Sequence, residues 1–175
     1  MNKQIFNILI IGILLGCKQG DPEAINNSPV INPPFVTGNY PETPFLFAVP
    51  TQGVRPIVWT AEGLPDGLEI DGSTGIISGN AGQKGEYEVH ITAENRFGKA
   101  ASKLVIKIGD LLALTPPMGW NSWNTFDVNI SDSLIRQIAD SMVSTGMRDL
   151  GYHYINIDDY WQLVDRDKNG RIQVN

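Results

Sequence analysis

The stretch YINIDDYW, residues 154–161, contains an apolar run that ends directly in two adjacent aspartates. The run begins earlier, as YHYINI in residues 152–157, and is nearly continuous in β-formers, as expected of a parallel strand buried on both faces. Successive strand residues face opposite ways, so Asp158 and Asp159 can share one pocket only where the chain leaves the strand. Like charges this close disfavour each other's ionised form, so the pair needs a partner. We predict a strand that ends in a loop bearing two carboxylates.

An amphipathic helix precedes this strand. In ISDSLIRQIADSMVSTG, residues 130–146, apolar side chains recur at helical spacing: Leu134, Ile135, Ile138, Ala139, Met142 and Val143. Ser131 or Asp132 can cap the start of the helix, and Gly146 can end it. Before the helix, LLALTPPMGWNSW in residues 111–123 supplies another strand. Strand, helix and strand make a βαβ unit, in which both strands are parallel.

This order places candidate binding residues at one edge of a sheet. In parallel α/β folds, ligands bind at the carboxyl ends of the strands. Trp120 lies near the end of the first strand and Asp158 at the end of the second, so both are expected to face one mouth. Acceptor-only carboxylates beside an indole suit a neutral polyol, whose hydroxyls donate and whose C–H faces lie on the ring. The pattern therefore favours a sugar as the ligand.

Other interpretations of these residues stay open. The aspartates could cap the following turn while the tryptophans fill the core. A metal is the weaker choice, because no histidine or third acid lies nearby in the sequence. DRDKNGRI, residues 165–172, matches the first half of an EF-hand-type calcium loop through Asp165, Asp167, Asn169 and Gly170. No clear helix precedes it and Asp-Lys-Asn-Gly is also typical of a hairpin turn, which we favour, so we predict no metal and no cofactor.

Two motifs in this part of the chain carry a family resemblance. LALTPPMGWNSWNTF, residues 112–126, and GMRDLGYHYINIDDYW, residues 146–161, resemble the start of the catalytic barrel of glycoside hydrolase family 27, the melibiase-type α-galactosidases. The resemblance implies a (β/α)8 barrel. It also implies that the residue matching Trp120 packs against galactose, and that the acids matching Asp158 and Asp159 accept hydrogen bonds from its hydroxyls.

The segment that carries the resemblance is short for a barrel. A full barrel needs about 250 residues and eight strands, whereas residues 110–175 hold two strands and the start of a loop. In this family the nucleophile and the acid/base lie on later strands, so we expect no catalytic carboxylate here and an inactive fragment. A retaining pair approaches the glycosidic bond from different sides with its carboxyl groups about 5 Å apart. Neighbours on one loop do not suit that role, so Asp158 and Asp159 are predicted to bind substrate.

Residues 35–109 show short candidate strands punctuated by turns. In EYEVHITAENRFG, residues 86–98, apolar and polar side chains alternate, as they do again around residues 103–108. Repeated at this spacing, the pattern predicts a small antiparallel β-sandwich. GLPDGLEIDGSTGIISG, residues 63–79, resembles the Ig-like module of bacterial surface and secreted proteins through its Gly-Leu-Pro-x-Gly-Leu turn and its Thr-Gly-x-Ile-x-Gly. Such modules are commonly spacers and say little about function.

The first residues are typical of an export signal. MNKQIFNILIIGILLGC, residues 1–17, has an early lysine and an apolar run that is too short to span a bilayer but suits a secretory h-region. Its end resembles a bacterial lipobox, in which Cys17 becomes the lipidated first residue. A buried free cysteine in an N-terminal helix is the alternative. Residues 18–34 contain four prolines and are predicted to be an extended linker.

Composition and charge narrow the possible partners. The formal net charge is −6 at pH 7 and the 13 Lys and Arg residues are scattered, so no basic stripe exists to bind nucleic acid. The single cysteine excludes an internal disulfide framework and a CxxC-type metal site. The chain has 175 residues, 42% of them apolar, which is enough for one domain or two small ones.

Together these features predict a multidomain chain. It comprises a lipoprotein signal peptide in residues 1–17, a linker in 18–34, an Ig-like β-sandwich in 35–109 and the first βαβ unit of an incomplete (β/α)8 TIM barrel in 110–175. The expected protein is an exported, lipid-anchored α-galactosidase of the bacterial cell envelope, periplasmic or at the surface. It would release terminal α-linked galactose from oligo- or polysaccharides by a retaining mechanism, and this chain would be its N-terminal part. The alternative is a non-catalytic carbohydrate-binding or adhesion protein with a degenerate barrel remnant.

Overall fold

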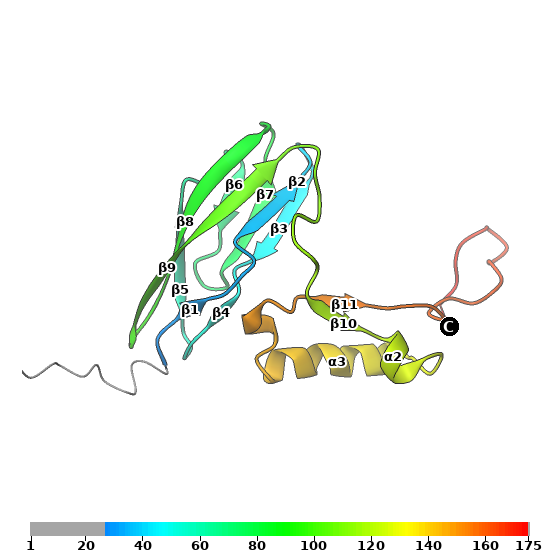
Figure 1. Cartoon of the computed structure of the whole chain (residues 1–175). Helices are drawn as coiled ribbons and strands as arrows, with labels where there is room; N and C mark the ends of the chain where they lie inside the picture. Colours follow the sequence, from blue (N-terminus) through cyan, green and yellow to red (C-terminus); the bar gives the residue numbers. More distant parts are fainter. Residues whose placement is uncertain (1–26, 175) are drawn as a thin grey trace, which may run out of the picture.

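The computed structural model describes residues 27–174, which form a sheet-rich unit followed by a smaller strand–helix–strand unit (Figure 1). Cys17 and the predicted signal peptide lie outside the described residues, as do residues 18–26 of the predicted linker. Within residues 27–174, no helix has the length and apolar composition needed to cross a bilayer. Lipid anchoring and export stay predictions.

Two main sheets form the core of the larger unit (Figure 1). The first has four strands in the order β2 (Val36–Asn39), β9 (Gly98–Ile108), β8 (Gly85–Asn95) and β5 (Val58–Glu62). The second has three strands in the order β3 (Pro44–Ala48), β7 (Ile76–Asn80) and β6 (Leu68–Ile70). In both sheets neighbouring strands are antiparallel, except for the parallel pair of β2 and β9.

The facing sides of the two sheets supply one apolar core. Over residues 89–93 of β8 and 104–108 of β9, every second side chain is buried: Val89, Ile91, Ala93, Leu104, Ile106 and Ile108. The opposite sheet contributes Phe45, Leu68 and Ile77 to the same cluster. A strand presents alternate residues to alternate faces, so the period of two in the sequence buries one face of the long hairpin. The predicted two-sheet sandwich is confirmed.

Packing explains the first glycine of the Thr-Gly-x-Ile-x-Gly motif. Gly75 has φ +72°, and a Cβ at this position would lie 2.8 Å from the ring of Trp59. Trp59 is 2% exposed, and its indole Nε1 donates a hydrogen bond to Thr51 Oγ1 at 3.1 Å. A residue without a side chain therefore lets the turn close directly over the buried indole.

Strand pairing begins earlier than the predicted sandwich boundary at residue 35. β1 (Val30–Ile31) lies within the predicted linker and pairs antiparallel with β4 (Thr51–Gln52). The Asn32 N–H continues the contact by donating to the Pro50 carbonyl at 2.8 Å. Proline is not accommodated in central strands but is compatible with short edge strands, so proline content alone does not locate this boundary.

The smaller unit has the predicted βαβ order. β10 (Gly119–Asn121) pairs in parallel with β11 (Tyr154–Asn156). Between them lie the one-turn helix α2 (Trp123–Phe126), the longer helix α3 (Asp132–Ser144) and the 3-10 turn η1 (Arg148–Leu150). Figure 1 shows α3 running alongside the two strands. The predicted strand, helix and parallel strand are confirmed.

The ends of α3 are those predicted from the sequence. Ser131 is the N-cap, and its Oγ accepts a hydrogen bond from the Leu134 N–H at 3.2 Å. Asp132, the other candidate cap, instead forms an ion pair with Arg136 one turn later. Gly146 has φ +81° just after the last turn, which few other residues adopt without strain.

The predicted burial of the second strand on both faces is wrong. Tyr154 in β11 is 54% exposed, and Ile157 just after it is 47% exposed. Ile155 is partly buried. Among residues 27–174, only β10 pairs with β11, and α3 runs along the strand pair, so one edge and part of one face stay open.

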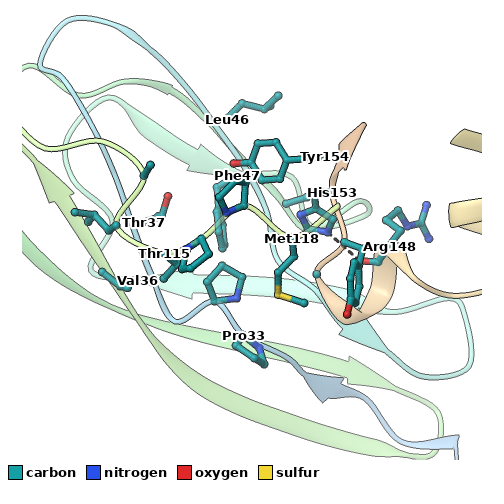
Figure 2. Close-up of a pocket in the computed structure, with 18 of the residues that line it drawn as sticks. Pro33, Val36, Thr37, Leu46, Phe47, Thr115, Met118, Arg148, His153 and Tyr154 are labelled. Atoms are coloured by element: carbon teal, nitrogen blue, oxygen red, sulfur yellow. Dashed lines mark hydrogen bonds between the residues drawn. The ribbon is translucent and has the colours of Figure 1, made fainter. Parts of the chain in front are cut away.

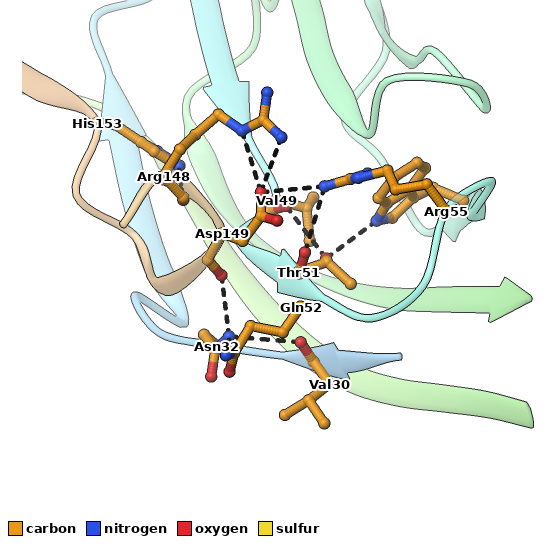
Figure 3. A network of polar contacts seen from close by, with 10 residues as sticks. Val30, Asn32, Val49, Thr51, Gln52, Arg55, Arg148, Asp149 and His153 are labelled. Carbon is orange, nitrogen blue, oxygen red and sulfur yellow. Dashed lines mark hydrogen bonds and ion pairs between the residues drawn. The ribbon is translucent and has the colours of Figure 1, made fainter. Parts of the chain in front are cut away.

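A polar network joins the sandwich to the βαβ unit (Figure 3). Asp149 Oδ1 lies 3.0 Å from Arg55 Nη2, which comes from the sandwich, and 2.9 Å from Arg148 Nη2. The Asn32 amide donates to the Asp149 backbone carbonyl at 2.9 Å. Asp149 therefore receives hydrogen bonds from two separate segments of the sandwich.

A cavity of about 800 Å³ lies beside this network, between the two units (Figure 2). Its lining includes residues 33–38 and 46–48 of the sandwich. The βαβ unit contributes residues 113–118 and 151–155, which contain the approaches to the amino ends of β10 and β11. The sandwich thus adjoins the amino ends of the two parallel strands, and Asp158 follows the opposite end of β11.

Candidate functional site

The carboxyl ends of β10 and β11 bring three polar residues together. Asn121 Nδ2 donates to Asp158 Oδ2 at 2.9 Å, and the Asp158 N–H donates to Ser122 Oγ at 3.0 Å. Ser122 is fully buried, and its own N–H donates to the Asn156 carbonyl at 3.1 Å. The end of the first strand and the aspartate after the second therefore meet at one edge, as parallel pairing requires.

The two aspartates lie on the loop that leaves β11. Asp158 Oδ1 accepts from the Asp159 N–H at 2.9 Å, and Asp159 Oδ1 accepts from the Tyr160 N–H at 2.8 Å. These are the hydrogen bonds expected if the aspartates cap the turn that follows the strand. Both side chains are nevertheless exposed, and within residues 27–174 Asp159 Oδ2 accepts no hydrogen bond. Capping thus leaves carboxylate acceptors on the pair that can receive hydroxyl donors.

Hydrogen bonding stabilises the charge on Asp158. The Asn121 amide and, secondarily, the Asp159 N–H lower the pKa of the Asp158 carboxyl below its ordinary value, against a small opposing effect of burial. The expectation that the adjacent pair disfavours ionisation is therefore wrong for Asp158. Donors that face the carboxylate outweigh the repulsion, and Asp158 is an anionic acceptor at neutral pH.

Aromatic side chains lie on the same loops. The rings of Trp123 and Tyr160 have centroids 6.4 Å apart with an angle of 36° between their planes, and they are 38% and 49% exposed as residues. Trp120, the predicted platform, is partly buried, and its ring lies 5.9 Å from that of Phe126. The sequence pattern does not single out Trp123, although GWNSW places a second indole just after the strand. Two exposed indoles therefore lie at the acidic loop: Trp123, whose ring lies beside that of Tyr160, and Trp161, which is 42% exposed and follows Tyr160 in the chain.

The candidate calcium segment forms a compact turn. Asp167 Oδ1 accepts from the N–H groups of Asn169 and Arg171, both at 2.8 Å. Gly170 has φ +78°, and its N–H donates to the Asp167 carbonyl at 2.9 Å. Across the described residues, no three His, Cys, Asp or Glu side chains gather in a way that could hold a metal ion. The hairpin-turn interpretation accounts for the Asp167 and Gly170 contacts.

Comparison with known families divides the chain at the same place. Residues 115–175 match the family described as "Alpha galactosidase A", and residues 28–108 match the family described as "Putative Ig domain". Alpha-galactosidase A of Cellvibrio japonicus is 60% identical over 63 residues, which are 36% of this chain and 15% of that protein. The alpha-galactosidase of Coffea arabica is 57% identical over 61 residues, which are 35% of this chain and 16% of that protein.

Solved structures are similar across both units. A "putative alpha-galactosidase/melibiase" of Bacteroides fragilis is 58% identical, with a TM-score of 0.82 over 87% of this chain and 33% of that one. A second "putative alpha-galactosidase" of the same organism is 56% identical, with a TM-score of 0.81 over 86% of this chain and 32% of that one. The chain spans about a third of these structures and about 15% of the curated relatives. It is therefore similar to alpha-galactosidases in its βαβ unit and to Ig domains in its sandwich.

Proposed function

We propose that the protein is an α-galactosidase that releases terminal α-linked galactose from oligo- or polysaccharides. The observation that carries this proposal is the similarity to the Bacteroides fragilis structures, at 58% identity and a TM-score of 0.82, across both units. The placement of Asp158 and Asp159 at the carboxyl edge of two parallel strands agrees with it, because that edge holds the ligand in parallel α/β folds. The activity belongs to the whole protein, of which this chain holds the acidic edge.

We infer that β10, α3 and β11 are the first strand, helix and second strand of a (β/α)8 barrel. Their parallel pairing and the single crossover support this inference. In such a barrel, Asp158 and Asp159 accept hydrogen bonds from galactose hydroxyls, and an indole covers the apolar face of the sugar. Trp123 and Trp161 are both more exposed than Trp120, and Trp120 remains the residue favoured by the family motif.

Asp158 and Asp159 are assigned to binding and not to bond cleavage. A retaining mechanism needs a nucleophile and an acid/base on opposite sides of the glycosidic bond, about 5 Å apart. Consecutive residues whose carboxylates both accept backbone N–H groups of one loop cannot take those two positions. The nucleophile and the acid/base would come from strands of the barrel other than β10 and β11.

Substrate specificity tests the proposal directly. The full-length gene product is assayed against 4-nitrophenyl α-galactoside, β-galactoside and α-glucoside, and only the first should be hydrolysed at an appreciable rate. Asp140→Ala is assayed in the same way as a control, because Asp140 is an exposed carboxylate on α3 and its loss should leave the activity unchanged. A folded protein that binds galactose without hydrolysing any α-galactoside would instead support the non-catalytic alternative.

We also propose that the protein is exported and anchored through a lipid on Cys17. The support is the sequence of residues 1–17, with its short apolar run followed directly by Gly16 and Cys17. Lipidation would place the sandwich and the acidic edge in the cell envelope, where extracellular or periplasmic galactosides are available.

A further inference from the structure

We propose that Asn121 is a positioning residue for Asp158, holding its carboxylate in the orientation that receives a sugar hydroxyl. The proposal rests on the proposed function, because it assigns Asn121 a role at the same site. Asn121 is the last residue of β10, and Asp158 follows β11, so the contact joins the ends of the two parallel strands.

The Asn121 amide is fixed at both ends. Its Oδ1 accepts a hydrogen bond from the Trp123 N–H at 2.9 Å, and its Nδ2 donates to Asp158 Oδ2 at 2.9 Å. A backbone N–H can only donate, so it selects the amide oxygen and leaves the NH2 group facing the carboxylate. The orientation of this side chain thus follows from its backbone partner and favours an ionised Asp158.

Asp158 is held at three points. Besides the Asn121 contact on Oδ2, its Oδ1 accepts from the Asp159 N–H at 2.9 Å. Its own N–H donates to the buried Ser122 hydroxyl at 3.0 Å. The backbone and both carboxylate oxygens therefore have fixed directions relative to the sheet, so little side-chain freedom is left to lose when a ligand binds.

The same amide connects the carboxylate to the aromatic side of the site. Its oxygen holds the N–H of Trp123, whose ring lies beside that of Tyr160. Loss of the Asn121 amide would remove one of the three contacts that hold Asp158, and it would also leave the Trp123 N–H at the start of α2 without this acceptor. A small displacement of binding groups costs a large factor in turnover, up to about 100-fold for roughly 1 Å.

The charge environment of Asp158 makes this role measurable. β10 and α2 carry no titratable side chain, and residues 157–162 after β11 add only Asp159 and Tyr160 to Asp158. The Asn121 hydrogen bond is the largest cause of the lowered pKa of Asp158. Removing that donor should raise the pKa toward its ordinary value, so protonation on acidification would set in at a higher pH than in wild type.

Two substitutions separate loss of the donor from loss of the fold. Asn121→Leu removes both hydrogen bonds. Asn121→Asp keeps the shape and an oxygen for the Trp123 N–H, but it replaces the donor by a charge that repels Asp158. Asn129→Leu is the matched control, because Asn129 is exposed in the connection between α2 and α3. Galactose affinity, KM and kcat for 4-nitrophenyl α-galactoside, and the 13C titration of the Asp158 carboxyl are measured in the full-length protein.

We expect both Asn121 variants to weaken galactose binding and raise KM by roughly ten- to 100-fold. The pKa of the Asp158 carboxyl should rise in both, and further in Asn121→Asp, while Asn129→Leu changes neither property. If Asp158→Ala weakens galactose binding but folded Asn121→Asp leaves affinity and titration unchanged, the positioning role is overturned. If Asp158→Ala itself leaves binding unchanged, the proposed function fails, and the positioning role fails with it.

Discussion

The Arg55 guanidinium of the sandwich lies 3.0 Å from the Asp149 carboxylate of the βαβ unit (Figure 3). The same guanidinium lies 5.3 Å from the centre of the Trp59 ring, within the range of a cation–π contact. Trp59 belongs to the buried core of the sandwich, so a continuous series of contacts runs from that core to Asp149. The sandwich is thus more than a spacer on a free tether, and it is seated at the end of the parallel strands opposite Asp158.

Disrupting this ion pair should weaken the coupling between the two units. A double-mutant cycle with Arg55→Met and Asp149→Asn should give a coupling of about 0.5–1 kcal/mol in chemical unfolding, because the pair is only partly exposed. The Lys84–Asp110 pair is more exposed on both sides, and its cycle should give a value near zero. Equal coupling energies for the two pairs would contradict the prediction.

Gly75→Ala should destabilise the sandwich by more than about 1 kcal/mol. The new methyl group would lie 2.8 Å from the Trp59 ring, at a residue whose φ is +72°. Gly109→Ala is the control, since no atom lies within 4 Å of the position of its Cβ and its φ is not positive. Midpoints of urea unfolding measure both changes, and a Gly75→Ala midpoint as high as that of Gly109→Ala would show that the close packing is not rigid.

Removing the acidic side chains should reduce turnover without unfolding the protein. We expect Asp158→Ala and Asp159→Ala to lower kcat/KM on an α-galactoside by roughly ten- to over 100-fold, as loss of a charge-assisted hydrogen bond predicts. Free galactose should bind more weakly as well, because these contacts exist in the ground state. Asp140→Ala should match wild type. A lower melting temperature with unchanged kinetics would return the aspartates to turn capping alone.

Comparing Trp123 with Trp120 decides between the exposed indole beside Tyr160 and the indole of the family motif as the contact with the sugar. Trp123→Ala should lower kcat/KM more than Trp120→Ala if the exposed ring beside Tyr160 is the platform. Trp120 packs against Phe126, so its loss should act mainly on the melting temperature. Intrinsic fluorescence titrated with galactose gives an independent readout, and a galactose response that disappears only in Trp120→Ala would favour the residue predicted from the family motif.

Cys17→Ser should abolish membrane attachment. Two or more acyl chains, each methylene contributing about 0.8 kcal/mol, hold a protein stably on a membrane. In Triton X-114 extraction of cells that express the full-length gene, wild type should enter the detergent phase and Cys17→Ser the aqueous phase. Wild type in the aqueous phase would exclude the lipid anchor.

The sequence by itself determined the local elements of this protein. Alternation of Val89, Ile91 and Ala93 with polar neighbours predicted a half-buried strand, because side chains in a strand alternate between faces. Helical spacing between Ser131 and Gly146 located α3 together with its caps, because capping depends on residues a few positions apart. The position of Asp158 at the end of a strand followed from the same local reasoning.

Only the tertiary structure decided which distant residues meet. The Asn121–Asp158 hydrogen bond joins residues 37 positions apart, and the Arg55–Asp149 contact joins residues 94 positions apart. Such pairs depend on strand register and on how two units pack, which no local pattern encodes. For the same reason the sequence predicts a linker where β1 pairs with β4, and it predicts burial on both faces for β11, in which Tyr154 is 54% exposed. Burial depends on what covers a residue, whereas periodicity shows only which side chains share a face.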